Sequence, residues 1–99
     1  MTPEGRRKSH LVAQVRKAGG AARKVVWQGR RGAPDWLVWW PGPISAFVEL
    51  KSDDGNLSKL QENEIRILRR DGWRVYVCST NDQIDAMISE LTHPNGCLQ

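Results

Sequence analysis

Hydrophobic and polar side chains follow one another along this chain in patterns that predict three helices and four strands. Apolar residues at helical spacing mark three segments: residues 4–18, Ser58 to about Asp71, and Asn81 or Asp82 to about Leu91. Runs of branched and aromatic residues, typical of strands, occupy residues 21–27, 35–40, 44–51 and 73–79. The order is therefore αβββαβα, which predicts an α/β domain of two or three layers with helices flanking a mixed sheet.

Turn residues mark the ends of these segments. Gly19-Gly20 follows the first helix as a stop signal, and Ser58 is a suitable N-cap for the second helix. Pro41-Gly42-Pro43 separates two strands by so short a link that an antiparallel hairpin is expected. Because no repeat or long linker divides the sequence, residues 1–99 are expected to form a single domain, with residues 92–99 as a flexible tail.

The composition is that of an ordinary globular protein with a basic balance. Hydrophobic residues make up 39% of the 99 positions and charged residues 26%. No apolar stretch approaches the roughly 20 residues of a membrane span, and the N-terminus lacks the apolar segment of a secretion signal, so no membrane partner and a cytoplasmic location are expected. The net charge of +4 favours polyanionic partners, of which nucleic acid is the commonest.

Three charged residues stand out in the runs 35–40 and 44–51. Glu49 and Lys51 lie two positions apart in one predicted strand, so their side chains share a face. Asp35 opens the preceding strand, and if the two strands pair, Asp35 and Glu49 lie close together near one edge of the sheet. Two carboxylates at that distance repel each other unless a cation lies between them. Oxygen ligands favour Mg²⁺ or Mn²⁺, and Lys51 beside them completes an inventory suited to phosphodiester hydrolysis.

Polar residues on the predicted helices and loops extend this constellation. Gln61 falls inside the apolar stripe of its helix and so needs polar partners at the sheet, and Glu64 falls within the same stripe. Glu4 lies two turns before Leu11 on one helical face, which directs it toward the sheet. Basic residues next to the proposed acids are candidates for DNA phosphate contacts: Arg30, Arg31 and Lys24.

The order of these residues resembles that of a known family. Four segments are similar to motifs of the VRR-NUC domain, a branch of the PD-(D/E)XK nuclease superfamily: "GAPD" at 32–35, "VELK" at 48–51, "LSKLQ" at 57–61 and "DGWRVYVC" at 71–78. A lone E-x-K pattern is weak, because it occurs often by chance, whereas Pro-Asp, E-x-K and a downstream Gln in this order are more specific. The resemblance covers nearly the whole chain and implies the restriction-endonuclease-like fold, in a stand-alone virus-type or bacterial member.

This resemblance implies a divalent-metal-dependent DNA endonuclease whose products carry a 5′-phosphate and a 3′-hydroxyl. Lys51 is implied as the catalytic lysine, and Gln61 as a supporting residue that orients this lysine or the water. Trp36 departs from the family, which often has Arg or a smaller apolar residue there, and this change affects substrate contacts. The implied metal ligands are the carboxylates of Asp35 and Glu49 and the backbone carbonyl of Leu50, with Glu4 as an additional candidate.

Stand-alone members of this family resemble resolvases in shape, so a homodimer that acts on branched DNA such as a four-way junction is the preferred hypothesis. A two-fold dimer presents two sites to a two-fold junction, which suits paired cuts. A chain of 99 residues leaves little protein for reading a base sequence, so recognition of DNA structure and backbone is expected.

Other interpretations of the same residues stay open. Glu49 and Lys51 can form an exposed cross-strand ion pair, and Glu4 can be an ordinary first-turn acid of a helix. Trp39 and Trp40 face opposite ways, so one of them is available for base stacking or a subunit contact unless helices cover both faces of the sheet. The second functional hypothesis is a non-catalytic basic DNA-binding module in a viral replication or packaging assembly, and a purely structural protein is the third.

Overall fold

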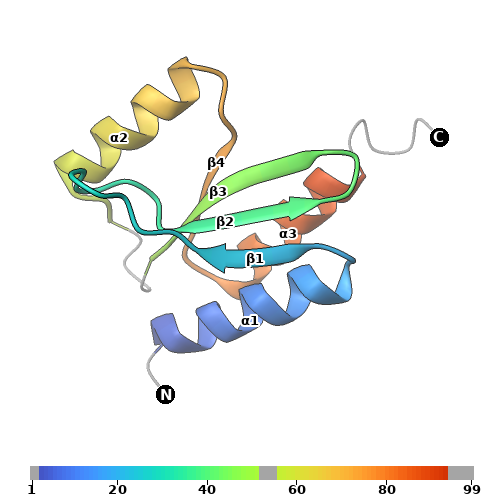
Figure 1. Ribbon diagram of the computed structural model, residues 1–99. Helices are drawn as coiled ribbons and strands as arrows, with labels where there is room; N and C mark the ends of the chain where they lie inside the picture. Colours follow the sequence, from blue (N-terminus) through green and yellow to red (C-terminus); the bar gives the residue numbers. More distant parts are fainter. Residues whose placement is uncertain (1–2, 52–55, 94–99) are drawn as a thin grey trace.

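The computed structural model describes the backbone of residues 3–51 and 56–93, and the side chains of this part from Gly5 onward. The described part contains seven elements in the predicted order (Figure 1). The helices are α1 (Pro3–Lys17), α2 (Lys59–Arg70) and α3 (Asn81–Thr92), and the strands are β1 (Ala21–Lys24), β2 (Trp36–Trp40), β3 (Ile44–Leu50) and β4 (Val75–Cys78). Within the described residues, no helix is long and apolar enough to cross a membrane. Of the predicted tail, Thr92 still belongs to α3, and residues 94–99 lie outside the described residues.

The strands form one mixed sheet in the order β1-β2-β3-β4 (Figure 1). β2 pairs antiparallel with β1 and with β3, which confirms the predicted hairpin around Pro41-Gly42-Pro43. β3 and β4 run parallel, and α2 lies in the crossover between them, since parallel neighbours cannot be joined by a tight turn. The prediction of a mixed sheet flanked by helices is therefore confirmed.

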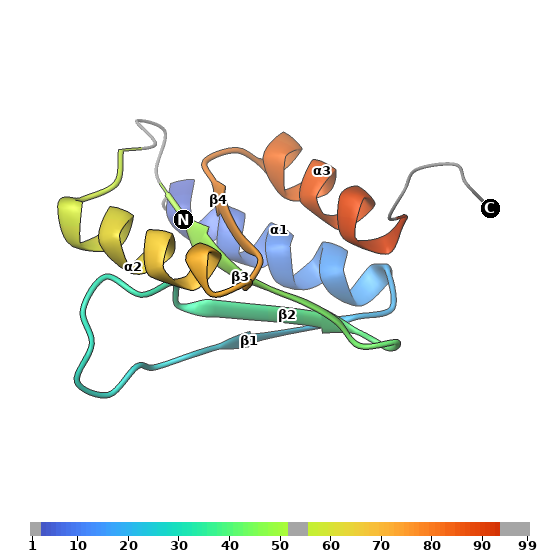
Figure 2. The ribbon, with the colours of Figure 1, turned by 90° about the horizontal axis from the view of Figure 1, so that it is seen from above.

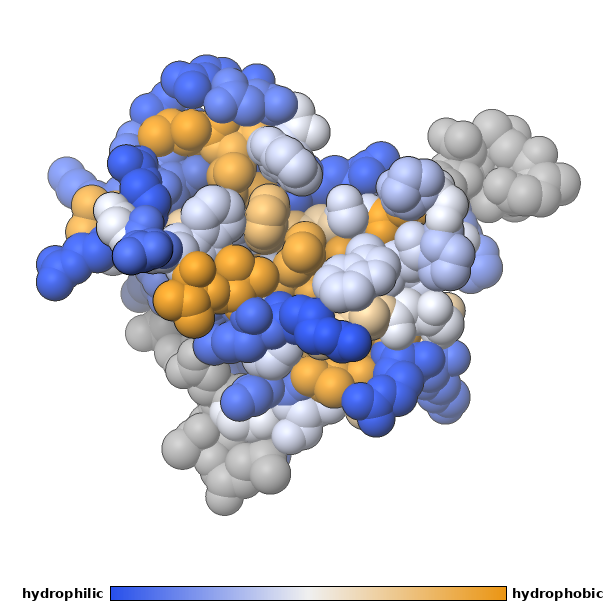
Figure 3. Space-filling model, viewed as in Figure 1, coloured by the Kyte–Doolittle hydropathy of each residue, from blue (hydrophilic) through white to orange (hydrophobic). Residues whose placement is uncertain are grey.

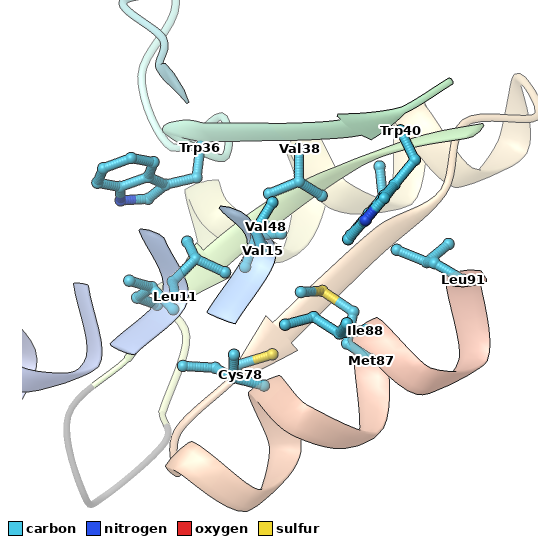
Figure 4. Packing of buried hydrophobic residues seen from close by; sticks show 13 residues of the cluster. Leu11, Val15, Trp36, Val38, Trp40, Val48, Cys78, Met87, Ile88 and Leu91 are labelled. Atoms are coloured by element: carbon cyan, nitrogen blue, oxygen red, sulfur yellow. The ribbon is translucent and has the colours of Figure 1, made fainter. Parts of the chain in front are cut away.

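One face of the sheet is covered by α1 and α3, which lie side by side (Figure 2). Even-numbered residues of β2 and β3 point to this face because side chains alternate along a strand. Leu11 and Val15 of α1 are fully buried against them (Figure 4), and so is Ile84 of α3. This interface therefore supplies most of the apolar burial that stabilises the fold. The buried cluster consists of Leu11, Val15, Trp36, Val38, Trp40, Ala46, Val48, Leu50, Cys78, Ile84, Met87, Ile88 and Leu91.

The opposite face is covered only in part, by α2. Ile65 of this helix packs against Phe47, an odd-numbered residue of β3. Beyond the helix, Trp39 is 38% exposed and Trp73 is 51% exposed. In the space-filling view, hydrophobic residues gather across this face between hydrophilic borders (Figure 3). Trp39 and Trp40 do face opposite ways, as predicted, because Trp40 belongs to the buried cluster under α1 and α3.

The first strand is shorter than predicted, since β1 ends at Lys24 rather than at residue 27. The Val25 amide still donates to the Asp35 carbonyl over 2.9 Å, but the chain then leaves the sheet. The Trp27 indole turns back and donates to the Pro34 carbonyl over 2.7 Å. The apolar residues that indicated a strand are therefore used to anchor the loop that follows β1.

The last strand is also shorter than predicted, because its first residues complete the end of α2. The Trp73 amide donates to the Leu68 carbonyl over 2.9 Å, and Gly72 has a φ of 95°, the left-handed conformation that ends many helices. β4 therefore begins only at Val75. The predicted stop at Gly72 is otherwise correct, with Asp71 as the C-cap.

Candidate active site

The adjacent ends of β2 and β3 bring the two predicted acids to one place. Trp36 and Val48 form the last pair of the ladder, and continuing the register by one step places Asp35 opposite Glu49. Opposite residues of an antiparallel pair have Cα atoms about 4.5–5.5 Å apart and side chains on the same face. Glu49 is 7% exposed, whereas the Asp35 side chain is 41% exposed. The two acids therefore differ in their access to solvent.

Glu49 is joined to Lys51 through the side-chain amide of Gln61. The Lys51 ammonium group donates to Gln61 Oε1 over 3.1 Å, and Gln61 Nε2 donates to Glu49 Oε2 over 3.2 Å. Lys51 follows the last residue of β3, and its amide donates to the Cys78 carbonyl over 2.9 Å, so the backbone at this end of the sheet is fixed. The amide thus holds a carboxylate and an ammonium group in a defined relative position.

Gln61 itself is fixed by the first turn of α2. Ser58 is the N-cap, and its hydroxyl oxygen accepts from the backbone N–H of Gln61 over 3.1 Å. In return, the side-chain oxygen Gln61 Oε1 accepts from the backbone N–H of Ser58 over 2.9 Å. This reciprocal pair is a capping box, which satisfies two backbone donors of the helix end. Reversing the side-chain amide would place its NH₂ group against two donors, so the hydrogen-bond partners determine its orientation.

The Leu50 carbonyl lies where proline removes a hydrogen-bond donor. The Phe47 amide donates to the carbonyl of Arg74, just before β4, and the Lys51 amide donates to Cys78 of β4. The backbone groups of even-numbered β3 residues therefore point toward β2. Continuing the register of these strands places Pro34 opposite Leu50. Proline has no N–H and cannot provide the next donor of the ladder. This gives a physical reason for a Pro-Asp sequence beside a carbonyl that is a candidate metal ligand.

Asp35 already has a cationic partner, the ammonium group of Lys24. The distance between Lys24 Nζ and Asp35 Oδ2 is 2.6 Å, and the side chains are 54% and 41% exposed. The same ammonium group lies 5.4 Å from the centre of the Trp36 ring, and Lys8 Nζ of α1 lies 5.9 Å from it. Both distances allow cation–π attraction. The lysine predicted to contact DNA therefore contacts a predicted metal ligand.

The predicted phosphate-binding arginines lie in the loop before Asp35. The Arg30 guanidinium group donates to both carboxylate oxygens of Glu64 on α2, a two-point contact. The Glu64 side chain is 12% exposed, and its hydrogen bond and charge raise the pKa of Arg30. Arg31 is exposed. This ion pair explains why an acid lies within the apolar stripe of α2.

Gly32 brings this loop into close contact with α2. A Cβ atom at Gly32 would lie 2.8 Å from the Leu60 carbonyl carbon and 2.9 Å from the Gln61 nitrogen. The φ of Gly32 is 81°, a conformation that other residues rarely adopt. The contact places the loop directly against the turn of helix that carries Gln61. Loop position and Gln61 position are therefore linked.

The donor set fits a hard divalent cation. Among the described side chains, those of residues 5–51 and 56–93, no three of His, Cys, Asp or Glu gather as a metal cluster. Two carboxylates opposite each other with a backbone carbonyl are nevertheless sufficient for Mg²⁺, which keeps several waters and needs only one or two protein carboxylates. The Lys24 ammonium group on Asp35 shows that this position attracts positive charge. The side chain of Glu4 lies outside the described residues.

Sequence reasoning identified the polar residues but not their partners. The place of Glu64 in an apolar stripe indicates that it needs a partner, but that partner, Arg30, lies 34 positions away in the sequence. The Lys24–Asp35 contact follows from β1 lying beside β2, and the alternation pattern does not specify which strands are neighbours. Gly32 lies in the "GAPD" segment, but its close contact with α2 has no sequence pattern.

Comparisons with known proteins find similarity in sequence and, for a solved structure, in fold. Residues 3–82 match the family model of the VRR-NUC domain. A protein of Acyrthosiphon pisum secondary endosymbiont phage 1, named "Putative nuclease p44", is 42% identical over 73 residues, which span 74% of this chain and 78% of that protein. A solved structure named "VRR_NUC domain" superposes with a TM-score of 0.83 at 33% identity and covers 90% of this chain and 97% of that one. The match over residues 3–82 includes all the proposed site residues.

Proposed function

Because this chain belongs to the VRR-NUC domain family, we propose that it is a nuclease, and more specifically a divalent-metal-dependent, structure-selective DNA endonuclease. The observation that carries the proposal is the hydrogen-bonded series from Glu49 through Gln61 to Lys51, at the end of β3 opposite Asp35. It combines two acids with a fixed ammonium group, which are the groups that phosphodiester hydrolysis needs. The name of the phage relative is consistent with this class of activity.

Mg²⁺ or Mn²⁺ is the proposed cofactor. The carboxylates of Asp35 and Glu49 and the carbonyl of Leu50 would hold it, since hard cations prefer oxygen ligands. Glu4, whose backbone lies in the first turn of α1, is a further candidate ligand. When bound, such an ion stabilises negative charge on the phosphate and lowers the pKa of a water molecule.

The protein's own groups position the reaction. The Lys51 ammonium group can donate to a phosphate oxygen as negative charge develops there, and Gln61 keeps this group from rotating freely. Glu49 is buried and held by Gln61, so its carboxylate does not have to be ordered when the substrate binds. Arg30, Arg31 and Lys24 are proposed to contact the DNA backbone, which positions the substrate without reading its sequence.

The proposed substrate is branched DNA, with a four-way junction as the first choice and duplex DNA as the alternative. A homodimer with two-fold symmetry would present two sites to the two halves of a junction. Trp39, exposed on the partly open face of the sheet, is available for a subunit contact, whereas Trp40 is buried in the core. The proposed location is the cytoplasm, that of the host if the protein is viral.

A cleavage assay tests this proposal. Purified protein is incubated with labelled four-way junction, flap, duplex and single-stranded DNA in Mg²⁺, Mn²⁺ or EDTA. We expect cleavage that requires the metal ion and falls at least about 100-fold in Asp35→Asn, Glu49→Gln and Lys51→Ala, because the first two changes remove proposed metal ligands and the third removes the ammonium group proposed to contact the reacting phosphate. Sedimentation of the free protein measures whether it is a dimer.

Asp71→Asn is the matched control for Asp35→Asn. Asp71 also forms an ion pair, 3.0 Å from Arg70, but it caps the far end of α2. This variant is expected to cleave at the rate of the unchanged protein. DNA binding without cleavage under every metal condition would favour the non-catalytic DNA-binding module, and equal cleavage by Asp35→Asn and Asp71→Asn would contradict the assignment of Asp35.

A further inference from the structure

The carboxylate of Asp35 carries an internal cation where the proposed metal is to bind. Lys24 Nζ lies 2.6 Å from Asp35 Oδ2. A divalent ion on the same carboxylate would lie within a few ångströms of this ammonium group, at a distance where like charges repel strongly. Lys24 and a divalent ion therefore compete for Asp35.

Lys24 differs in this respect from the other lysine of the site. The Lys51 ammonium group donates to the neutral side-chain amide of Gln61 over 3.1 Å, and the same amide donates to Glu49 over 3.2 Å. Lys24, in contrast, bonds directly to a carboxylate that is 41% exposed and so accessible to ions from solvent. The difference assigns competition with the metal to Lys24 rather than to Lys51.

The surroundings of Lys24 allow its ammonium group to move without a backbone change. Lys24 is paired with Trp36 in the sheet, and the next residue, Val25, donates to the Asp35 carbonyl over 2.9 Å, so the main chain is fixed. The side chain itself is 54% exposed and has rotatable bonds. The centre of the buried Trp36 ring lies 5.4 Å from Lys24 Nζ. The face of this ring would still attract the ammonium group after it has left Asp35.

We propose that Lys24 is a displaceable counter-ion of Asp35: it neutralises this carboxylate in the metal-free protein, is displaced by the divalent ion, and then contacts a DNA phosphate beside the site. The inference rests on the proposed function, because it takes Asp35 as a metal ligand. This exchange couples metal binding to DNA binding, because the metal ion releases the Lys24 ammonium group, which can then contact the DNA. Such coupling is reciprocal, so DNA should also tighten metal binding.

The first test measures Mn²⁺ binding by titration calorimetry without DNA. Lys24→Met removes the competitor, and because an exposed ion pair contributes up to about 1 kcal/mol, we expect binding about two- to fivefold tighter than in the unchanged protein. Lys8→Met is the matched control, since Lys8 lies 5.9 Å from the same Trp36 ring but, within the described part of the chain, forms no ion pair with Asp35. Lys24→Gln, a polar replacement on the same exposed strand, should give the same result as Lys24→Met.

The outcomes separate this inference from the proposed function. Mn²⁺ binding by the unchanged protein that Asp35→Asn does not weaken would overturn Asp35 as a ligand, and with it the proposed metal site. Binding that depends on Asp35 but is unchanged or weaker in both Lys24 variants would overturn the inference alone. Tighter binding in Lys8→Met to the same extent would also overturn it, because a general loss of charge would then explain the effect.

The second test measures the release of Lys24 toward DNA. Binding of a labelled duplex is followed by fluorescence anisotropy in Ca²⁺ and in EDTA, with gels to confirm that the DNA stays intact. We expect Lys24→Met to weaken binding about two- to fivefold in Ca²⁺ and less in EDTA, where Lys24 is held by Asp35. Lys8→Met should have the same effect in both conditions. An equal loss in Lys24→Met with and without Ca²⁺ would overturn the release.

Discussion

The two faces of the sheet differ in how completely helices cover them. Under α1 and α3, apolar side chains from two helices and three strands are buried in one cluster. Under α2, only a smaller cluster around Phe47, Ile65 and Val75 is buried, and the polar series ending at Lys51 lies beside it. β3 contributes to both faces, because Val48 faces the covered side and Glu49 the other. Alternation along one strand thus separates the stabilising core from the candidate site.

The largest expected effect tests the energetic side of this comparison. Ile84→Ala, at a fully buried position of α3, should lower the free energy of unfolding by about 2–5 kcal/mol, the usual range for a cavity in a core. Leu60→Ala on α2, where Leu60 is 54% exposed, should cost less than about 1 kcal/mol. Urea unfolding followed by tryptophan fluorescence measures both. Similar losses in the two variants would mean that the partly open face contributes as much stability as the covered one.

The next effect concerns the contact between the loop and α2. Gly32→Ala combines a left-handed backbone with a clash against the helix, so we expect a loss of about 2–4 kcal/mol in the free energy of unfolding. Gly29→Ala is the control, because its φ is 76° but its Cβ would meet nothing within 4 Å, and about 1–2 kcal/mol is expected. Urea unfolding measures the difference, and equal losses would show that the loop yields without straining α2.

A change in Gln61 should separate activity from stability. Gln61→Glu keeps the capping box with Ser58, since Glu serves there as well as Gln, but it replaces the N–H donor to Glu49 by a negative charge. We expect at least about tenfold slower cleavage, or about 1.4 kcal/mol, with a smaller change in the free energy of unfolding. Gln61→Ala loses the capping box and should lower both. If Gln61→Glu cleaves normally, the amide of Gln61 has no part in positioning the site.

The smallest expected effect lies on the covered face and depends on pH. Burial, assisted by the hydrogen bond to Glu90, raises the pKa of Tyr76 to about 12. Its neutral form is therefore favoured in the folded state, so this contribution is complete below about pH 10 and is lost as the pH rises toward 12. Tyr76 is the single tyrosine of the chain, so an ultraviolet titration reads it directly. A midpoint near 10 in the folded protein would contradict this rise in the pKa of Tyr76.

Local signals in the sequence were sufficient for the order of elements and for most of their ends. Ser58 and Gly72 begin and end α2 as predicted, because caps depend on residues within a few positions. The first strand was expected to continue through Trp27 but ends at Lys24, and the Trp27 indole instead donates to the Pro34 carbonyl. That bond depends on how the loop folds back onto β2, and no periodicity in the sequence records the path of a loop.

The polar residues of the candidate site could be predicted from the sequence, and the reason is physical. A charged residue in an apolar strand, such as Glu49, or an amide in an apolar helical stripe, such as Gln61, is costly without a partner, and this cost makes it visible in the sequence. The contacts made by long basic side chains are different. Lys24 and Arg30 are ordinary surface residues in sequence terms, and only the three-dimensional arrangement selects Asp35 and Glu64 as their partners.

The lengths of the outer strands bear on how copies of this chain meet one another. β1 and β4 form the two edges of the sheet, and each has only four residues. Edge strands that are short and carry charge, as β1 does with Arg23 and Lys24, are poor templates for the strands of another molecule. The fold therefore resists edge-to-edge aggregation, and a symmetric pair of subunits would have to meet through side chains on a face rather than by extending the sheet.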